Sequence, residues 1–597
     1  MTGGLLHDLV RGPEETGPAA PALVSADGEI SYGALWQRVA VTAELLTERG
    51  VRPGDAVGLF FFRSADYVTS LLATLAVGAV AVPLDPEYPA ERVGHMLAAT
   101  DPRLVLRGSG GRHPDETLRP ERWAAVGDLP GAGTELRSRP ALGPERTTTA
   151  AQEQPALVLF TSGSTGTPKG VRLHHGGLVN RLEWGLRQYR FDADDRVLHK
   201  ASIAFDASLH EIFSPLMAGG TLVIAPPGTQ YDSLGLVRLM QDQEVTCAHF
   251  VPSMLRYVLD EPELQDCLDL RLLFCGGEAL DMELVRRLRR ALPECAVFNQ
   301  YGPTETSVNV SYWDTREAYA GGTAPIGRAV DGAELHVRTA DMAPVADGEI
   351  GELWVGGLPL ALGYLDEAQT SERFRPDPHG PPGTRLYRTG DLVRLAPAGH
   401  LEYHGRADDQ VKIRGIRVEP GEVASTLRAH PAVRDAVVTA VSGGPTGPRL
   451  VAHVVPSDPR TGPETAAAVR AHAATALPPA MRPEQVVVLD RLPRLPNGKV
   501  NRHDLPAPPD PHTGPTPAAP AGATTEDRLR DIWREALGVD TVRDEDDFLA
   551  LGGHSLVALR VSTRVRETAG IEVAPSSCLR VPTFGDWLAE VSRPVGV

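Results

Sequence analysis

Short apolar runs alternate with longer helical patterns along most of the chain. Residues 157–160, 221–224 and 270–274 are short and mainly apolar, a pattern typical of buried strands. The first and last precede glycine-rich segments, and the second follows a helical pattern. This alternation predicts α/β layers. Residues 107–153 differ, because they are polar and rich in Gly, Pro and Arg, and they predict a surface loop.

The tail from residue 524 onward shows helical spacing only. Over 526–537, apolar residues recur at intervals typical of one helix face, namely Leu529, Ile532, Trp533 and Leu537. Thr525 is the expected N-cap of this helix and Gly538 its expected C-terminal stop. A second amphipathic helix is expected from Ser555, and a third pattern covers 584–591. The tail is therefore predicted to be a small helical bundle.

A linker is predicted between this tail and the rest of the chain. Residues 506–523 are nearly all Pro, Ala, Gly and Thr, a composition that cannot bury a core and favours an extended segment. A chain of 597 residues is also too long for one hydrophobic core. We expect several domains, with a large unit before the linker and a small one after it.

Composition excludes several classes of protein. The hydrophobic fraction of 42% and the charged fraction of 23% are ordinary for a globular protein, and the net charge of -18 argues against nucleic-acid binding. The five cysteines show no CxxC pair, which argues against a zinc site or a disulfide framework. The N-terminus lacks a signal-peptide pattern, and the apolar stretch 71–84 is too short to span a bilayer. We expect a cytoplasmic protein with no membrane partner.

Residues 159–171, with the sequence LFTSGSTGTPKGV, form a candidate phosphate-binding loop. Small residues let backbone amides approach phosphate oxygens, hydroxyl groups can donate, and Lys169 supplies a counter-charge. The loop is not a Walker A motif, because Pro168 precedes the lysine and Gly170 follows it. Only four of the 59 lysines and arginines are lysines, which makes Lys169 stand out. The alternative is a flexible linker with an incidental lysine.

Further motifs follow this loop in a fixed order. They are FDASLHE at 205–211, NQYGPTET at 299–306, GELWVGG at 351–357, YRTGD at 387–391, GRADDQVKIRGIRVEPGEV at 405–423 and LPNGKVNR at 495–502. Together with the loop they resemble the adenylation domains of nonribosomal peptide synthetases, within the adenylate-forming superfamily. The segment DDFLALGGHSLVAL at 546–559 is similar to the phosphopantetheine-attachment motif of carrier proteins.

The resemblance implies an α/β (α+β) adenylate-forming enzyme followed by an all-α, four-helix carrier domain. It implies a large N-terminal subdomain over 1–404, a small mobile C-terminal subdomain over 405–505, the linker at 506–523 and the carrier domain over 524–597. Asp408 matches the family's hinge residue, and its alternative is an exposed loop aspartate.

The resemblance also implies residue roles in ATP binding and catalysis. Lys499 would act on the substrate carboxylate and the phosphate, Thr304 on the α-phosphate and Glu305 on Mg²⁺. Asp391 would hold the ribose hydroxyls, and Arg406 would help to hold the ribose or the phosphates. The full set expected to bind ATP or AMP is Thr161, Ser162, Gly163, Ser164, Thr165, Gly166, Lys169, Gly277, Asn299, Tyr301, Gly302, Thr304, Asp391 and Arg406.

The family's specificity positions predict the amino-acid pocket. Besides Lys499 they are Asp206, Ala207, His210, His249, Phe274, Gly276, Gln300, Val308 and Asn309. Asp206 would bind the α-ammonium. Four of the remaining residues are polar, and an apolar substrate would leave their hydrogen bonds unmade at about 1 to 3 kcal/mol each. The pocket predicts a polar amino acid, neutral or acidic. The alternative is that water, or hydrogen bonding between the two histidines, satisfies these polar groups and that the selectivity is different.

The expected activity is ATP-dependent formation of an aminoacyl-AMP and its transfer, as a thioester, to 4′-phosphopantetheine on Ser555. ATP, Mg²⁺ and 4′-phosphopantetheine are the expected cofactors. The expected partners are a phosphopantetheinyl transferase and a downstream condensation domain or tailoring enzyme, because HHxxxDG and GxSxG motifs are lacking. A small MbtH-like protein is a further possible partner. Two alternatives stay open, an acyl- or aryl-CoA ligase and a non-catalytic carrier scaffold, although the fused carrier argues against the first.

Overall fold

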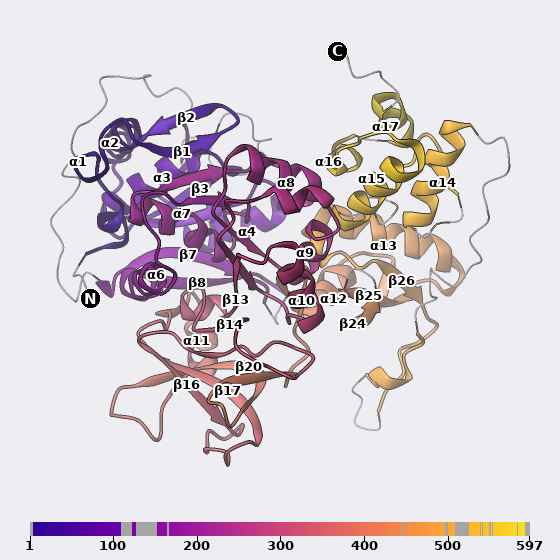
Figure 1. Cartoon of the computed structure of the whole chain (residues 1–597). Coiled ribbons are helices and arrows are strands. Elements are labelled where there is room, and N and C mark those ends of the chain that lie inside the picture. Colours follow the sequence, from indigo (N-terminus) through magenta and orange to yellow (C-terminus); the bar gives the residue numbers. More distant parts are fainter. Residues whose placement is uncertain are drawn as a thin grey trace. The chain divides into compact units, whose positions relative to one another are not determined.

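The computed structural model describes residues 4–108, 122–126, 152–163, 166–444, 447–495, 500–507 and most of 524–591. It divides into two compact units, which are described separately below (Figure 1). The first contains residues 1–161, 168–227 and 236–409, and the second contains residues 162–167, 228–235 and 410–597. The break between Asp409 and Gln410 lies beside Asp408, the predicted hinge residue.

The first unit contains a nine-stranded sheet whose central strands are parallel. Parallel strands need crossover connections, and the helical segments between the strands provide them. The spatial order is β15 (Arg328–Ala329), β14 (Ser311–Asp314), β13 (Ala296–Tyr301), β12 (Leu272–Gly276), β11 (Cys247–Phe250), β9 (Arg196–His199), β10 (Thr221–Ile224), β1 (Pro21–Ser25) and β2 (Gly28–Ser31). Strands β13 to β1 pair in parallel, and the pairs at both edges are antiparallel.

A seven-stranded sheet forms the second large layer of this unit. Its order is β18 (Gly363–Tyr364), β8 (Lys169–His174), β7 (Pro155–Thr161), β4 (Val80–Leu84), β3 (Ala56–Phe60), β5 (Leu104–Arg107) and β6 (Trp123–Ala125). The pairs from β7 to β6 are parallel, whereas β7 and β8 form an antiparallel hairpin. The glycine-rich segment is the connection of that hairpin.

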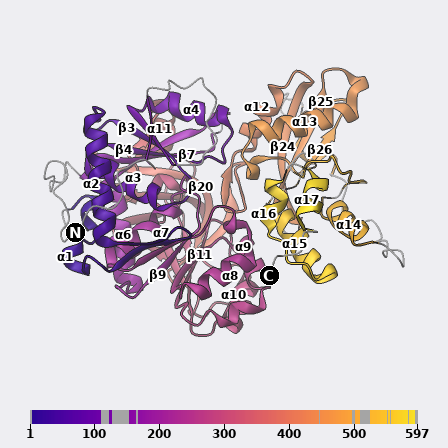
Figure 2. The ribbon, with the colours of Figure 1, turned by 90° about the horizontal axis from the view of Figure 1, so that it is seen from above.

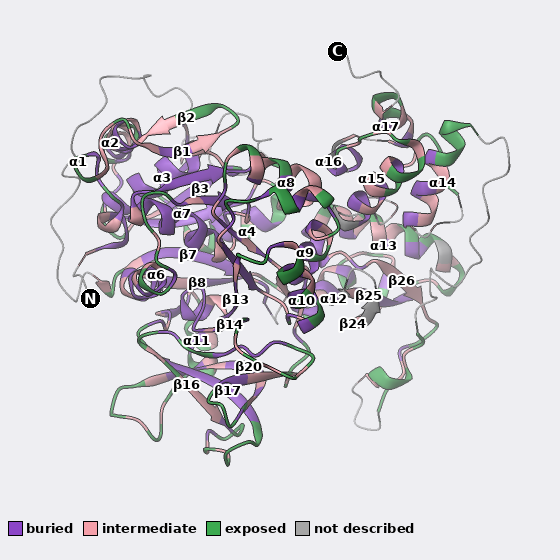
Figure 3. Cartoon of the chain, in the orientation of Figure 1, coloured by how far each residue is buried: buried purple, intermediate pink, exposed green. Residues whose placement is uncertain are grey.

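Two helices lie between the sheets. In α3 (Ala65–Ala76) the ten residues from Tyr67 are all buried, and in α7 (Ala207–Ala218) the ten residues from Ser208 are all buried. A helix that is buried on every side belongs in the interior. One hydrophobic cluster joins these helices and α2 (Tyr32–Glu48) and α6 (His175–Tyr189) to β3, β7 and β8 of one sheet and β1 and β10 of the other (Figure 3). The predicted α/β layers are confirmed.

The other helices of this part of the chain are shorter. They are α1 (Pro13–Thr16), α4 (Ala90–Thr100), α8 (Ser233–Asp242), α9 (Pro252–Val258) and α10 (Met282–Ala291).

A third, antiparallel sheet completes the first unit. Its order is β16 (Ala333–Arg338), β17 (Ile350–Gly357), β20 (Arg385–Leu395) and β19 (Phe374–Pro376), with β21 (Leu401–Arg406) also paired to β20. The short helix α11 (Glu367–Arg373) packs beside it. The register places Asp391 of β20 opposite Arg406 of β21. This pairing builds one part of the site.

The second unit begins with a small α+β fold. It contains the hairpin of β22 (Val411–Ile413) and β23 (Ile416–Val418), and a sheet of β24 (Val433–Gly444), β25 (Gly447–Pro456) and β26 (Gln485–Val488). Helices α12 (Pro420–Arg428) and α13 (Gly462–Ala476) pack on that sheet (Figure 2). Their apolar faces share one core with the strands.

Four helices follow the linker: α14 (Thr525–Leu537), α15 (Ser555–Ala569), α16 (Pro575–Arg580) and α17 (Phe584–Val591). Their core is centred on Trp533, whose ring lies 4.8 Å from Phe548 and 5.1 Å from both Phe584 and Trp587. The four-helix carrier fold is confirmed. In the part of the chain that the structure describes, no helix is both long enough and apolar enough to cross a membrane.

Three predicted boundaries were wrong. The polar stretch 107–153 contains strand β6, because Ala124 is buried and the Trp123 ring packs edge-on against Phe60 at 5.7 Å. The N-cap of α14 is Thr524, which exchanges hydrogen bonds with Asp527, and not Thr525. The strand expected at 270–274 begins at Leu272. Residues 508–523 of the linker and Gly538 lie outside the described residues.

Candidate active site

Asp391 is the centre of a hydrogen-bonded cluster at the predicted ribose site. Its carboxylate accepts from Tyr301 Oη at 2.5 Å and from Arg406 Nη1 at 2.6 Å. Arg406 also donates to Asp408 at 2.7 and 3.0 Å, so the predicted hinge residue belongs to the same cluster. Burial and the adjacent Asp391 charge raise the pKa of Tyr301 well above its ordinary value. Tyr301 therefore keeps its proton and acts as a donor.

Glu305 is fully buried in the middle of the three-residue helix Thr304–Thr306. Its Oε1 accepts a hydrogen bond of 2.6 Å from Tyr364 Oη in β18. The Nζ of Lys169 lies 5.8 Å from the centre of the same tyrosine ring. Tyr364 thus links the lysine of the glycine-rich hairpin to the predicted magnesium ligand. The pairing of β18 with β8 brings these groups together.

The predicted pocket residues gather where three parallel strands end. His249 in β11 lies opposite Phe274 in β12, and Gly276 in β12 lies opposite Gln300 in β13. The carboxyl ends of parallel strands share one edge of a sheet, where ligands bind in α/β folds. A side chain on Gly276 would come within 3.2 Å of His249 Nε2, so glycine leaves room there.

Helix α7 brings His210 to the same place. Its ring centre lies 5.0 Å from that of Phe274, and its Nδ1 shares a hydrogen bond of 2.8 Å with Ser214. Asp206 is the N-cap residue of this helix, and its side chain makes no capping bond there. Asp206 and Ala207 therefore stand at the end of α7 that leads to the pocket residues.

A tight turn positions the last two predicted pocket residues. Ser307 and Val308 have φ angles of 57° and 80°, a region that a β-branched residue rarely adopts. The turn folds the chain back onto Gly302, where an added Cβ would lie 2.3 Å from the Asn309 Cα. Glycine is required at this close approach, and Asn309 is brought beside the strand that carries Gln300.

Comparison with known proteins assigns this arrangement. The family model for AMP-binding enzyme matches residues 12–365, the model for AMP-binding enzyme C-terminal domain matches 422–499, and the model for phosphopantetheine attachment site matches 527–591. The chain belongs to the AMP-binding enzyme family. It is an adenylation domain joined to a carrier domain, as the sequence predicted.

Curated relatives of this adenylation–carrier chain are longer proteins. It is 40% identical over 586 residues to phosphinothricin tripeptide synthetase PhsB of Streptomyces viridochromogenes, covering 96% of this chain and 48% of that protein. It is 37% identical over 585 residues to a dimodular nonribosomal peptide synthase of Bacillus subtilis, covering 95% of this chain and 24% of that protein. The chain thus spans half or less of the length of these relatives.

Solved structures resemble most or nearly all of the adenylation–carrier chain. Holo-PA1221, an NRPS protein containing adenylation and PCP domains bound to a vinylsulfonamide inhibitor, superposes with a TM-score of 0.76 at 25% identity, covering 98% of this chain and 97% of that one. NpsA-ThdA, an artificially fused adenylation–PCP di-domain from Klebsiella oxytoca, gives a TM-score of 0.69 at 27% identity, covering 81% and 93%.

Several other predicted ATP-binding residues of the adenylation domain lie in or next to strands and in the glycine-rich connection. Thr161 ends β7, and its hydroxyl is buried without a hydrogen-bond partner in the described chain. Gly277 has a φ of 82° directly after β12. Asn299 donates at 2.7 Å to the carbonyl of Pro325, which fixes its amide plane and directs its Oδ1 away from that carbonyl. Ser162, Gly163 and Gly166 belong to the glycine-rich connection, whose Ser164 and Thr165 lie outside the described residues.

The adenylation domain offers one carboxylate that fits the ligand preference of Mg²⁺. Mg²⁺ binds through one or two carboxylates together with substrate phosphates, and Glu305 supplies a buried carboxylate whose Oε1 is already oriented by Tyr364. The described residues contain no cluster of three or more His, Cys, Asp or Glu that could hold a metal by itself. The phosphates of ATP would have to supply the other ligands.

The side chains of two predicted residues, Lys499 and Ser555, are not described by the structure. Lys499 lies outside the described residues, between Leu495 and Val500. Ser555 is the first residue of α15, so its backbone position at a helix start is confirmed, and its side chain is not described.

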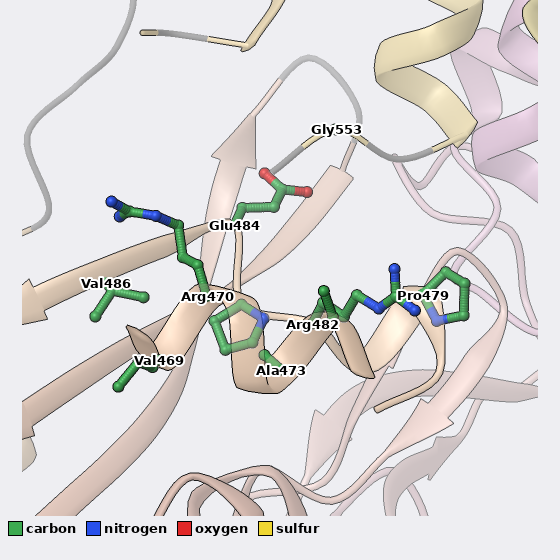
Figure 4. Close-up of a pocket in the computed structure, with 10 residues that line it drawn as sticks. Val469, Arg470, Ala473, Pro479, Arg482, Glu484, Val486 and Gly553 are labelled. Carbon is green, nitrogen blue, oxygen red and sulfur yellow. The ribbon is translucent and has the colours of Figure 1, made fainter. Parts of the chain in front are cut away.

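A small pocket of the second unit is separate from this chemistry. It lies between α13 and the segment leading to β26, it also includes Gly553, and it encloses about 20 Å³ (Figure 4). That volume holds about one water molecule, so neither an amino acid nor ATP fits it. Arg482, next to the LPPAM segment at 477–481, lines it.

Sequence reasoning missed two residues of the site, Tyr364 and Arg181. Tyr364 follows the GELWVGG motif and resembled an ordinary apolar strand residue. Arg181 of α6 is 0% exposed and donates through Nε to Asn309 Oδ1. Its signal was its position in the helix, three residues after Leu178 and four before Gly185, on the face that is buried.

Proposed function

We propose that the chain activates a polar amino acid, neutral or acidic, as an aminoacyl adenylate and loads it onto its own carrier domain. A substrate carboxylate oxygen attacks the α-phosphorus of ATP, and the bond from that phosphorus to the pyrophosphate oxygen breaks. The acyl group then passes to the carrier as a thioester and AMP leaves. The observation that carries this proposal is the presence, in one chain, of the AMP-binding and the phosphopantetheine-attachment matches.

The ribose of ATP is assigned to Asp391. Each of its two carboxylate oxygens already accepts one hydrogen bond, from Tyr301 and from Arg406, and each has a further lone pair for a ribose hydroxyl. Arg406 orients Asp391 through its hydrogen bond to Oδ1. Asn299 and the ring of Tyr301 are assigned to the adenine, with Gly277 and Gly302 allowing close approach.

The phosphates are assigned to the glycine-rich hairpin, with Thr161, Ser162, Gly163, Ser164, Thr165 and Gly166 as donors and Lys169 as counter-charge. Thr304 is assigned to the α-phosphate. Glu305 would hold Mg²⁺, which when bound neutralises charge on the phosphates. Lys499 would meet the carboxylate and the α-phosphate together, where fixed positive charge lowers the barrier between two anions.

The domain roles follow from the same assignment. Residues 1–404 would bind the substrates, 405–505 would bring Lys499, 506–523 would act as the tether and 524–597 as the carrier. Asp408 is assigned as the hinge, and its bonds to Arg406 connect that hinge to the ribose site. Tethering keeps the carrier at a high effective concentration.

The partners we propose are those that a carrier requires. A phosphopantetheinyl transferase would modify Ser555, and a downstream condensation domain or tailoring enzyme would accept the acyl group. An MbtH-like protein is a further candidate partner. The location we propose is cytoplasmic, because the five cysteines are all free and buried, and reduced cysteines are typical of cytoplasmic proteins.

ATP–pyrophosphate exchange with a panel of amino acids tests the proposal. At least one polar amino acid should support exchange, and Lys499→Ala should lower its rate by at least about a hundredfold. Arg460→Ala, which removes an 88% exposed cation from the same unit, is the matched control and should leave the rate unchanged. Exchange that is undiminished in a folded Lys499→Ala protein, or that requires no amino acid, would contradict the assignment.

A further inference from the structure

Arg181 is a buried cation whose hydrogen-bonding capacity is largely unused. Its side chain is 0% exposed, and Nε donates to Asn309 Oδ1. Nη1 and Nη2 are both buried and have no hydrogen-bond partner among the described residues. Arg181 also forms no ion pair within the described part of the chain. Native proteins rarely leave such groups unsatisfied, and an unsatisfied buried group needs a structural or functional explanation.

The groups around Arg181 fix the position of its guanidinium, and they do not compensate its charge. The guanidinium lies 5.1 Å from the centre of the Trp184 ring, on the same helix. Gly185 leaves the space that Nη1 occupies, because an added Cβ would approach that nitrogen to 2.6 Å. Burial lowers the pKa of Arg181 to about 10, so the side chain is still protonated at neutral pH.

The neighbours of Arg181 are the predicted pocket residues. Asn309 is its hydrogen-bond partner, and Asn309 Nδ2 is a second buried donor without a partner among the described residues. Desolvation, followed by the charges of Arg181 and His249, lowers the pKa of His210 well below its ordinary value. The histidine is therefore neutral, and Arg181 supplies the positive charge on this side of the pocket.

The carboxylate of Glu211 interacts with groups other than Arg181. Its Oε2 accepts from His199 at 2.8 Å and from the backbone amides of Lys200 and Ala201 at 3.0 Å, whereas its Oε1 is buried without a hydrogen-bond partner among the described residues. The nearby charges that act on this carboxylate include those of His199 and Lys200. Asp206 is assigned to the α-ammonium group of the substrate. Arg181 and Asn309 therefore present three unsatisfied donor nitrogens and one cation to the substrate side chain, whereas the unsatisfied oxygen of Glu211 lies near the buried cation Lys200.

We propose that Arg181 is a specificity-determining residue and that the amino acid it selects carries a side-chain carboxylate. This inference rests on the proposed function and narrows its substrate class from polar to acidic. A carboxylate accepts two parallel hydrogen bonds from a guanidinium, and a side-chain amide or an alkyl group leaves the buried charge uncompensated. Asn309 Nδ2 would donate to the same carboxylate.

The test compares each acidic amino acid with a neutral counterpart in ATP–pyrophosphate exchange. Glutamate with glutamine, aspartate with asparagine, and 2-aminoadipate with norleucine form the panel, with leucine and lysine added. For the wild-type chain, kcat/KM for the best acidic substrate should exceed that for its neutral counterpart at least tenfold. A buried site built for a charged partner discriminates strongly against an analogue that lacks it.

Arg181→Met removes the cation and leaves a shorter, unbranched apolar side chain. It should lower kcat/KM for the acidic substrate at least a hundredfold and reduce the ratio of acidic to neutral substrate to about one. Arg187→Met, on the same helix and paired at the surface with Asp331, is the matched control and should keep the wild-type ratio. If Arg181→Met does not fold, the wild-type panel alone decides.

A neutral amino acid turned over faster than every acidic one would overturn the inference and leave the proposed function standing. Absence of exchange with any amino acid would instead contradict the proposed function, and the inference with it. An unchanged ratio of acidic to neutral substrate in folded Arg181→Met would show that another group selects the side chain.

Discussion

Asp391 and Arg406 form a buried ion pair, with 2.6 Å between Oδ1 and Nη1 and side chains that are 5% and 9% exposed. The antiparallel register of β20 and β21 places the two residues opposite each other. Tyr301 reaches the other carboxylate oxygen from the nine-stranded sheet. Two sheets of the first unit therefore converge on a single carboxylate.

Asp391→Asn should weaken ATP binding, raising the KM for ATP at least tenfold while the amino-acid KM changes little. The amide keeps the shape of the side chain. It loses the charge that holds Arg406, and it loses one of the two oxygen acceptors for the ribose hydroxyls. Arg406 keeps its ion pair with Asp408, so the loss of unfolding free energy should be modest, about 1 to 3 kcal/mol. Pyrophosphate exchange at varied ATP and thermal unfolding measure the two effects.

Asp458→Asn is the control for this variant, because it removes the carboxylate of an exposed pair with Arg460. It should change neither the KM for ATP nor stability by a measurable amount. An Asp391→Asn enzyme with wild-type KM for ATP would contradict the ribose assignment.

Tyr364→Phe should raise the Mg²⁺ concentration that gives half-maximal exchange by roughly tenfold, because the hydrogen bond that orients Glu305 is lost. Maximal exchange at saturating Mg²⁺ should recover most of the wild-type rate. A magnesium titration of the exchange reaction measures both.

Tyr319→Phe removes a comparable bond, of 3.0 Å to Glu402, in another part of the first unit. It should leave the magnesium dependence unchanged. Equal behaviour of the two variants would show that Tyr364 has no part in metal binding.

Acid should destabilise the first unit through its uncharged histidines. Desolvation lowers the pKa of His199, His210 and His249, that of His249 to about 4. The unfolded chain then binds more protons than the folded one, so stability is full above the ordinary histidine pKa of 6.5 and falls as the pH drops toward 4.

His249 alone should account for about 2 kcal/mol of the stability lost between pH 7 and pH 5. Urea unfolding at the two pH values should therefore show a smaller acid effect in His249→Gln than in the wild-type chain. His379→Gln, at an exposed position in the first unit, is the control and should match the wild type. Equal acid effects in all three proteins would contradict this pKa shift.

The sequence predicted the elements that depend on local pattern and missed those that depend on distant neighbours. Strands such as β10 follow directly from four consecutive β-favouring residues, and α14 and α17 from helical spacing. Strand β6 could not be recognised, because a three-residue run is too short to show a strand pattern. Only its contact with Phe60 and its pairing with β5 identify it. Thr524 and Thr525 are equally good caps by composition, and only the bond to Asp527 distinguishes them.

The candidate site was predictable where a motif encodes it. Asp391, Arg406 and Tyr301 come from three motifs, and their meeting depends on a sheet register that no motif states. Arg181 carries no motif, and a helical arginine is normally solvent-exposed. Its importance appears only when Asn309, 128 positions later, is folded back against Gly302 by the Ser307–Val308 turn.

The central claim is that one chain both activates an amino acid and receives it, and mass spectrometry of the intact chain tests this most directly. After treatment with a phosphopantetheinyl transferase and coenzyme A, the wild-type chain should gain one phosphopantetheine, and ATP with the preferred amino acid should add one aminoacyl group. Ser555→Ala should gain neither while still supporting pyrophosphate exchange. A wild-type chain with unchanged mass, or an aminoacyl group on Ser555→Ala, would contradict the account.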